Sequence, residues 1–125
     1  MELNDLTYKI RNAIYEVFKN LGPGLLESTY EAALIYELSA LNLKVRNQIP
    51  MPFNYKGVKL DAGYRIDILV EESVILEIKS VDQLHNVHKK QLLTYLKLSG
   101  KKLGYLVNFN TTKLIDKESL IRIIN

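Results

Sequence analysis

The sequence predicts a single α/β domain in which helices flank a central mixed β-sheet. Apolar residues recur with helical spacing in the first third of the chain and again after residue 84, and short segments rich in Val, Ile and Tyr occupy most of the remainder. A chain of 125 residues has the length of one domain. We therefore expect one domain over residues 1–125 with the element order ααβββ(β)αββ.

Two helices are predicted at the start of the chain. Apolar residues at three-and-four spacing over residues 6–21 indicate the first, which Asn4 or Asp5 can cap. The segment Gly22-Pro23-Gly24 ends it, because glycine suits the left-handed turn after a helix and proline cannot continue one. A second apolar stripe predicts a helix from residue 25 to about residue 42.

Residues 44–81 are predicted to form a meander of strands, broken at prolines and at short polar turns. Residues 64–70 and 74–79 are nearly continuous in apolar side chains, which is typical of strands buried on both faces. The remaining predicted elements are a helix at residues 84–99 ended by Gly100, a buried strand at 103–109 and an edge strand at 120–124.

Composition excludes several classes of protein. With 47% hydrophobic and 25% charged residues the chain is not disordered. It has no apolar run near the ~20 residues of a membrane span and an acidic start where a signal peptide is basic, so we expect a cytoplasmic protein without a membrane partner. The absence of cysteine excludes disulfides, thiolate zinc sites and thiol nucleophiles. A net charge of +3 permits an anionic partner such as nucleic acid.

Three charged residues lie inside the two most apolar strands. If the hairpin between these strands is centred on Glu72, Asp67 lies opposite Glu77, and Arg65 lies opposite Lys79. Directly opposite residues have Cβ atoms ~5 Å apart. A slip of one residue in the turn would remove this pairing.

Two carboxylates at that distance repel unless a proton or a cation lies between them, and Mg²⁺ prefers oxygen ligands of this kind. Asp67 and Glu77 are therefore candidate metal ligands, and Lys79 could stabilise charge on a phosphate. The alternatives are a solvated Lys–Glu pair at a strand end and buried ion pairs that fix strand register. The residues alone leave these interpretations open.

Helical geometry indicates further polar residues that could reach this site. Glu27 points toward the apolar side of the second helix, where it could reach a metal or could simply complement the helix dipole. His88, Gln91 and Tyr95 share one face of the third helix and could reach a phosphate or satisfy buried backbone groups. Lysines of this region would contact a phosphate backbone if they share a face, or else are solvated: Lys89, Lys90, Lys97, Lys101 and Lys102.

The combination of these motifs resembles a known family. Asp67 followed by Glu77-Ile78-Lys79 resembles the signature of the PD-(D/E)XK nuclease superfamily, and Gly24-Leu25-Leu26-Glu27-Ser28-Thr29-Tyr30 matches the motif of its small GxxExxY branch. The likeness continues through Tyr55-Lys56-Gly57 and through residues 63–67, 88–96 and 106–109.

This resemblance implies a restriction-endonuclease-like core and a Mg²⁺- or Mn²⁺-dependent endodeoxyribonuclease that acts as a homodimer. It implies that Asp67, Glu77 and the carbonyl of Ile78 bind the metal, that Glu27 joins directly or through water, and that Lys79 is the catalytic lysine. The alternative is a non-catalytic nucleic-acid-binding or regulatory module that retains the fold. Residues expected to support the site or to contact nucleic acid are Tyr30, Arg65, His88, Lys89, Lys90, Gln91 and Tyr95.

Overall fold

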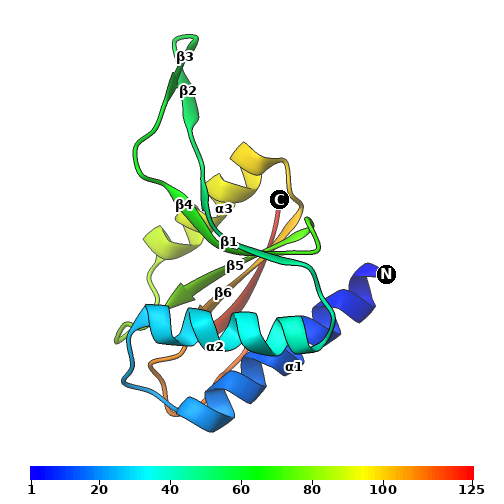
Figure 1. Cartoon of the computed structure of the whole chain (residues 1–125). Helices are drawn as coiled ribbons and strands as arrows, with labels where there is room; N and C mark the ends of the chain where they lie inside the picture. Colours follow the sequence, from blue (N-terminus) through cyan, green and yellow to red (C-terminus); the bar gives the residue numbers. More distant parts are fainter.

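The computed structural model describes residues 1–125 as three layers. Helices α1 (Leu3–Leu21) and α2 (Glu27–Ala40) cover one face of the sheet, and α3 (Asn86–Ser99) covers the other (Figure 1). Two apolar cores correspond to these two faces. The larger one joins buried side chains of α1 and α2 to the sheet, and the smaller one joins Leu92, Tyr95 and Leu96 of α3 to the opposite face.

The sheet has five strands in the order β1-β4-β5-β6-β7. Only β5 and β6 run parallel, joined by a crossover through α3, whereas the other neighbours are antiparallel. The predicted mixed sheet flanked by helices is therefore confirmed. The strand bounds are Val45–Pro50 for β1, Arg65–Val70 for β4, Val74–Lys79 for β5, Leu103–Asn108 for β6 and Leu120–Ile124 for β7.

The predicted meander over residues 44–81 is wrong in one respect, because part of it leaves the sheet. Strands β2 (Phe53–Tyr55) and β3 (Val58–Leu60) pair only with each other and project from the body as a hairpin (Figure 1). Prolines 50 and 52 cannot donate to a ladder, so the chain departs at the end of β1. Lys56 and Gly57, with φ of 50° and 79°, form the tight turn, and the chain then returns as β4 beside β1.

The helix ends differ slightly from the prediction. Asn4 and Asp5 do not cap α1, because the helix begins at Leu3 and the carbonyl of Glu2 already accepts a bond from the Leu6 N–H at 3.0 Å. Gly22 ends α1 as predicted, with a φ of 66°. The second and third helices each begin two residues after the predicted start. None of the helices is long and apolar enough to span a bilayer.

Gly104 in β6 lies where α3 packs most closely on the sheet. A Cβ atom there would lie 2.9 Å from a Leu92 methyl carbon and 3.2 Å from the carbonyl oxygen of Ile75. Gly104→Ala is therefore expected to lower the free energy of unfolding by about 1–3 kcal/mol, because the core is overpacked. Urea denaturation followed by circular dichroism measures this change, and an unchanged midpoint would contradict the close approach.

Candidate active site

Strands β4 and β5 pair in the predicted register near the turn. Farther from the turn, side-chain hydrogen bonds replace the backbone ladder. The ladder joins Val70 to Val74, Leu69 to Ile75 and Ile68 to Leu76, which confirms a turn centred on Glu72. Beyond Ile68 the ladder stops, so the predicted pairing of Arg65 with Lys79 is not part of it.

At the point where the ladder stops, Asp67 and Glu77 reach across the gap between the strands. Asp67 Oδ2 accepts a hydrogen bond from the Ile78 N–H at 2.8 Å, and Glu77 Oε1 accepts one from the Asp67 N–H at 3.1 Å. Each carboxylate is therefore fixed by the backbone of the neighbouring strand. The predicted proximity of these two carboxylates is confirmed.

A distortion of two adjacent strands aims Asp67 toward α2. Ile66 packs in the core under α3, whereas Ile68 packs in the core under α1 and α2, although residues two apart in a regular strand share a face. Opposite Asp67, Gln48 of β1 has a left-handed φ of 51°, and the β1–β4 ladder skips this pair. Strand distortions of this kind re-aim a side chain, and here they turn the Asp67 carboxylate into a cleft.

This cleft has a volume of about 430 Å³ and lies between α2 and the sheet. Glu27, at the start of α2, accepts a hydrogen bond from the Ser80 N–H at 3.2 Å, directly after Lys79. The predicted placement of Glu27 near the metal candidates is confirmed, since it lines the cleft with Asp67. The complete lining is Glu27, Ser28, Glu31, Gln48, Asp67 and Ile78.

Glu31 is a member of the site that the sequence reasoning missed. It lies one helical turn after Glu27, so both carboxylates project from the same face of α2. Gln48 donates to Glu31 Oε1 at 2.7 Å, and the negative charge of Glu31 helps to raise the pKa of Asp67. The four-residue spacing from Glu27 was the available signal.

Burial dominates the electrostatics of the carboxylate pair. Glu77 is only 3% exposed, and this burial, followed by the charge of Asp67, raises its pKa to about 8. Burial also raises the pKa of Asp67, opposed by the hydrogen bond from the Ile78 N–H. At neutral pH the pair therefore holds a proton unless a cation neutralises it.

The donor set suits a hard divalent cation. Asp67 Oδ1 and Glu77 Oε2 take no hydrogen bond from the chain, and no buried side-chain oxygen lacks a partner, so solvent reaches both atoms. The side chains do not form a ready cluster of three or more acidic or imidazole groups. Carboxylate oxygens and water are ligands of the kind that Mg²⁺ accepts. Ile78 lines the cleft beside Asp67.

Lys79 lies at the α3 side of the pair. Alternation along β5 places it on the same face as Glu77, and none of the three ion pairs of the chain involves it. Burial, followed by the positive charge of Lys79, lowers the pKa of His88 at the start of α3. Lys79 therefore has a free ammonium group close to the carboxylates.

Helix α3 supplies the predicted polar face. Gln91 Nε2 donates to the Tyr95 hydroxyl at 3.0 Å, and His88 Nδ1 accepts from the His85 N–H at 2.9 Å. Burial, followed by the charge of Glu77, raises the pKa of Tyr95, so this hydroxyl lies near the carboxylate pair. The structure thus brings His88, Gln91 and Tyr95 to the side of the site that carries Lys79.

Tyr30 has a purely supporting position. Its side chain is fully buried, and its ring stacks on Phe109 with centroids 4.5 Å apart. Its hydroxyl donates to the Gly22 carbonyl at 2.6 Å and accepts from the Leu25 N–H at 3.2 Å, which fixes the loop before Glu27. Contact with nucleic acid, one of the two roles expected of it, is excluded by this burial.

The basic residues predicted near the site do not gather on one surface. Arg65 is exposed at the start of β4, and Lys90 lines a pocket beside Gln91 and Tyr95. Lys89, although adjacent to Lys90 in the sequence, lines a different pocket. Consecutive residues of a helix point about 100° apart, so Lys89 and Lys90 do not share the face that joint contact with a phosphate backbone would require.

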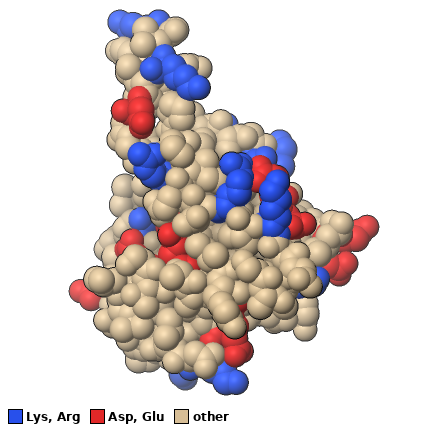
Figure 2. Space-filling model, viewed as in Figure 1, with Lys and Arg blue, Asp and Glu red and all other residues tan.

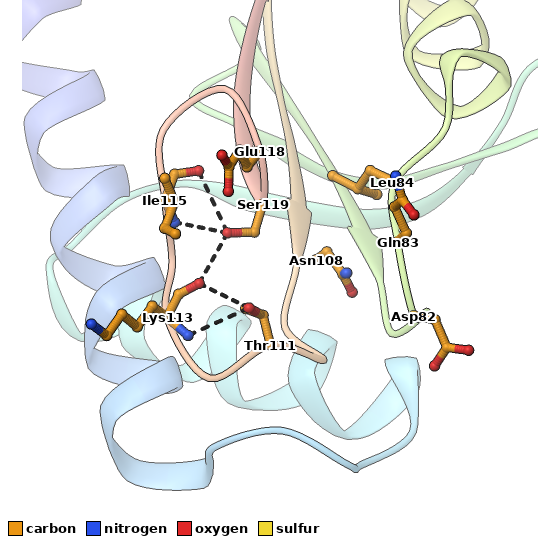
Figure 3. Close-up of a pocket in the computed structure, with 9 residues that line it drawn as sticks. All are labelled: Asp82, Gln83, Leu84, Asn108, Thr111, Lys113, Ile115, Glu118 and Ser119. Carbon is orange, nitrogen blue, oxygen red and sulfur yellow. Dashed lines mark hydrogen bonds between the residues drawn. The ribbon is translucent and has the colours of Figure 1, made fainter.

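Asn108, at the end of β6, is a second residue that the sequence reasoning missed. Its carboxamide accepts from the Val81 N–H at 3.1 Å and donates to the Val81 carbonyl at 2.9 Å, which holds the segment after Lys79 in place. Figure 3 shows Asn108 between this segment and the loop that carries Ser119. The small pocket there has a volume of about 160 Å³, and the Ser119 hydroxyl that lines it is already bonded to Ile115 and Lys113 of the same loop.

Comparison with known proteins identifies the family. The model of the PD-(D/E)XK nuclease superfamily matches residues 4–123, which is nearly the whole chain. No curated protein and no solved structure matches the chain. The matched region includes the paired carboxylates, Lys79 and every element of the sheet. The chain therefore belongs to the PD-(D/E)XK nuclease superfamily, and its mixed sheet flanked by helices is the restriction-endonuclease-like fold.

Proposed function

We propose that this protein is a metal-dependent nuclease that hydrolyses phosphodiester bonds of DNA and belongs to the GxxExxY branch of its superfamily. One observation carries the proposal. Asp67 and Glu77 are each held by the backbone of the neighbouring strand, and each keeps one oxygen free toward solvent. A purely structural ion pair would join each carboxylate to a basic side chain, and none of the three ion pairs of the chain includes Asp67 or Glu77.

The proposed ligands of Mg²⁺ or Mn²⁺ are Asp67, Glu77 and the carbonyl oxygen of Ile78. Glu27 would join them directly or through water, since it faces Asp67 across the cleft. A cation bound there would polarise the phosphodiester and lower the pKa of a water molecule. Glu31 and Gln48, which are hydrogen-bonded to each other, would orient water on the α2 side.

The proposed role of Lys79 is electrostatic. Its ammonium group, unpaired with any acidic side chain, can donate to a non-bridging phosphate oxygen as negative charge develops there. Gln91 and Tyr95, joined by a hydrogen bond, can position the same phosphate from α3. Because cleavage of both strands of a duplex needs two such sites, we propose that a homodimer is the active form on duplex substrates.

Metal titration combined with a cleavage assay tests the proposal. Isothermal titration with Mn²⁺ is expected to show binding to the wild type and loss of binding in Asp67→Asn, because the amide keeps the shape and the bond from Ile78 but removes the charge. Wild type is expected to cleave DNA in Mg²⁺ or Mn²⁺ and not in EDTA. Substrates are linear duplex, branched and single-stranded DNA, with an RNA of the same sequence in parallel.

Asp5→Asn is the matched control, since Asp5 is exposed on α1, and it should bind metal as wild type does. Folded wild type that binds no Mn²⁺ would refute the metal site. Nucleic-acid binding that survives EDTA, without cleavage under any condition, would favour a non-catalytic binding or regulatory module. Cleavage of RNA alone would overturn the assignment to DNA.

A further inference from the structure

The projecting β2–β3 hairpin has one apolar face without a partner. Phe53 pairs with Leu60 and Tyr55 pairs with Val58, so all four side chains lie on the same face of the two-stranded ribbon. Tyr55 and Val58 are each 56% exposed and Leu60 is 39% exposed. Adjacent apolar side chains that stay exposed do not contribute to the core, and a contiguous apolar surface of this kind indicates a binding surface.

This face continues as a row of aromatic rings toward the carboxylates. The ring of Phe53 meets the edge of Tyr64 at a centroid distance of 6.4 Å, and Tyr64 meets Tyr95 at 6.0 Å. Tyr64 is 40% exposed and lines a pocket of about 360 Å³ together with Lys90, Gln91 and Tyr95. The row therefore ends at the side chains of α3 that flank Glu77.

The charges beside the row are mainly basic, although Asp61 is exposed between β3 and Tyr64. Lys56 Nζ lies 5.6 Å from the centre of the Tyr55 ring, and Lys59 is exposed on the opposite face of β3, where it pairs with Asn54. Figure 2 shows basic side chains at the top of the hairpin and an acidic side chain below them. Helix α3 contains three lysines and no acidic residue, whereas α2 contains three glutamates and no lysine or arginine. A polyanion is therefore attracted to the hairpin and α3 and repelled by α2.

Single-stranded nucleic acid fits this surface better than duplex does. A β-ribbon that reads a major groove uses polar side chains on base edges, but the exposed face here carries Tyr, Val and Leu. Aromatic rings stack on the faces of bases, which are accessible only where the bases are unpaired. Alternating aromatic and basic side chains are the pattern of single-strand binding surfaces.

A second copy of the chain is the competing occupant, and two features oppose it. A stable interface buries about 800 Å² on each partner, whereas the apolar face consists of two strands of three residues. Two-fold pairing through the apolar face would also place Lys56 of both copies in one small interface. Charge and size thus favour a nucleic acid.

We propose that the β2–β3 hairpin is an arm that binds unpaired nucleic acid, with bases stacked on Tyr55 and Tyr64 and phosphates contacted by Lys56 and Lys90. The arm would lead a single strand to Asp67 and Glu77. This assignment rests on the proposed nuclease function and narrows its substrate to single-stranded, flapped or branched nucleic acid.

Fluorescence anisotropy in EDTA tests the arm without any contribution from cleavage. A labelled 20-nucleotide single strand is expected to bind wild type about tenfold more tightly than a duplex of the same sequence. Tyr55→Ala and Tyr64→Ala should each weaken single-strand binding by about fivefold to tenfold, because a stacking surface is lost. Tyr36→Ala, at a 73% exposed tyrosine of α2, should bind as wild type does.

Two further variants test the contributions of stacking and of charge to affinity, and distinguish both from an effect of misfolding. Tyr64→Phe keeps the ring and should retain wild-type affinity. Lys56→Ala combined with Lys90→Ala should reduce the slope of log affinity against log salt by about 0.7 for each lysine removed, while Lys19→Ala on α1 should not. Thermal melts establish that each variant is folded.

The outcomes distinguish the arm from the nuclease function. Unchanged single-strand affinity in folded Tyr55→Ala and Tyr64→Ala overturns the arm, whether or not wild type cleaves DNA. Conversion of a dimer to a monomer by Tyr55→Ala, with affinity unchanged, overturns it in favour of a second copy. Arm-dependent binding supports the arm even if metal-dependent cleavage is absent, in which case the nuclease function alone fails.

Discussion

Lys79→Met is expected to slow phosphodiester cleavage by about a hundredfold to a thousandfold, the usual effect of removing one group that stabilises a developing negative charge. The methionine retains an unbranched chain, so packing around β5 should change little. Affinity for Mn²⁺ should be retained or slightly increased, because the removed ammonium group repels a cation. Single-turnover cleavage of a labelled strand, together with calorimetric titration of Mn²⁺, measures both quantities.

Lys97→Met is the matched control, since Lys97 lies near the end of α3 and is exposed. It should cleave at the wild-type rate. Loss of Mn²⁺ binding in Lys79→Met would show that the lysine maintains the metal site and does not act on the phosphate. Full activity of a folded Lys79→Met would remove Lys79 from the proposed chemistry and leave metal and water to act without it.

Helices α2 and α3 carry opposite charges on the two sides of the β4–β5 pair, so the two sides attract different ligands. Carboxylates on the α2 side suit a cation, and uncompensated lysines on the α3 side suit a polyanion. Asp67 and Glu77 lie where β4 and β5 separate, so both sides reach them. The separation of the strands is therefore the structural feature that allows metal and phosphate to meet.

The sequence predicts the carboxylate pair because strong local signals determine its surroundings. Glu71-Glu72-Ser73 interrupts two continuous apolar runs, and this fixes the turn and the register across it. Charges inside those runs could only be functional or paired. Helical periodicity similarly placed His88, Gln91 and Tyr95 on one face.

The missed features depend on contacts between distant segments. The left-handed backbone of Gln48 is opposed to Asp67 across the β1–β4 pair, and no turn residue marks it in the sequence. Pro50 and Pro52 mark the point where the hairpin leaves the sheet. Periodicity carries no information on which later strand then becomes the partner of β1. The role of Asn108 depends on its hydrogen bonds with the backbone of Val81, which lies 27 residues earlier in the chain.

Glu77→Gln is expected to raise the free energy of unfolding of the metal-free protein at pH 8. The decrease of this free energy with rising pH should be much smaller in the variant than in wild type. The pKa of Glu77 rises from 4.5 in the unfolded chain to about 8 in the native state. Between these two values the native state binds more protons than the unfolded state, so the free energy of unfolding falls as pH increases. One pKa unit is worth about 1.4 kcal/mol, so this carboxyl accounts for about 3–5 kcal/mol over the interval.

Urea denaturation in EDTA at pH 5, 6, 7 and 8 measures the effect as the difference between wild type and variant, which cancels the titration of the other groups. The glutamine keeps an oxygen that can accept from the Asp67 N–H, so the difference reports the charge and not a lost bond. Glu2→Gln, exposed before α1, should follow wild type at every pH. Added Mg²⁺ should stabilise wild type most at pH 8 and leave Glu77→Gln nearly unchanged, because a cation binds the charged pair and gains little from the neutral amide. If the free energies of unfolding of wild type and Glu77→Gln change with pH in parallel, solvent or Lys79 already stabilises the charged form of this carboxylate. Any stabilisation of the fold by a bound metal would then have to depend on Asp67.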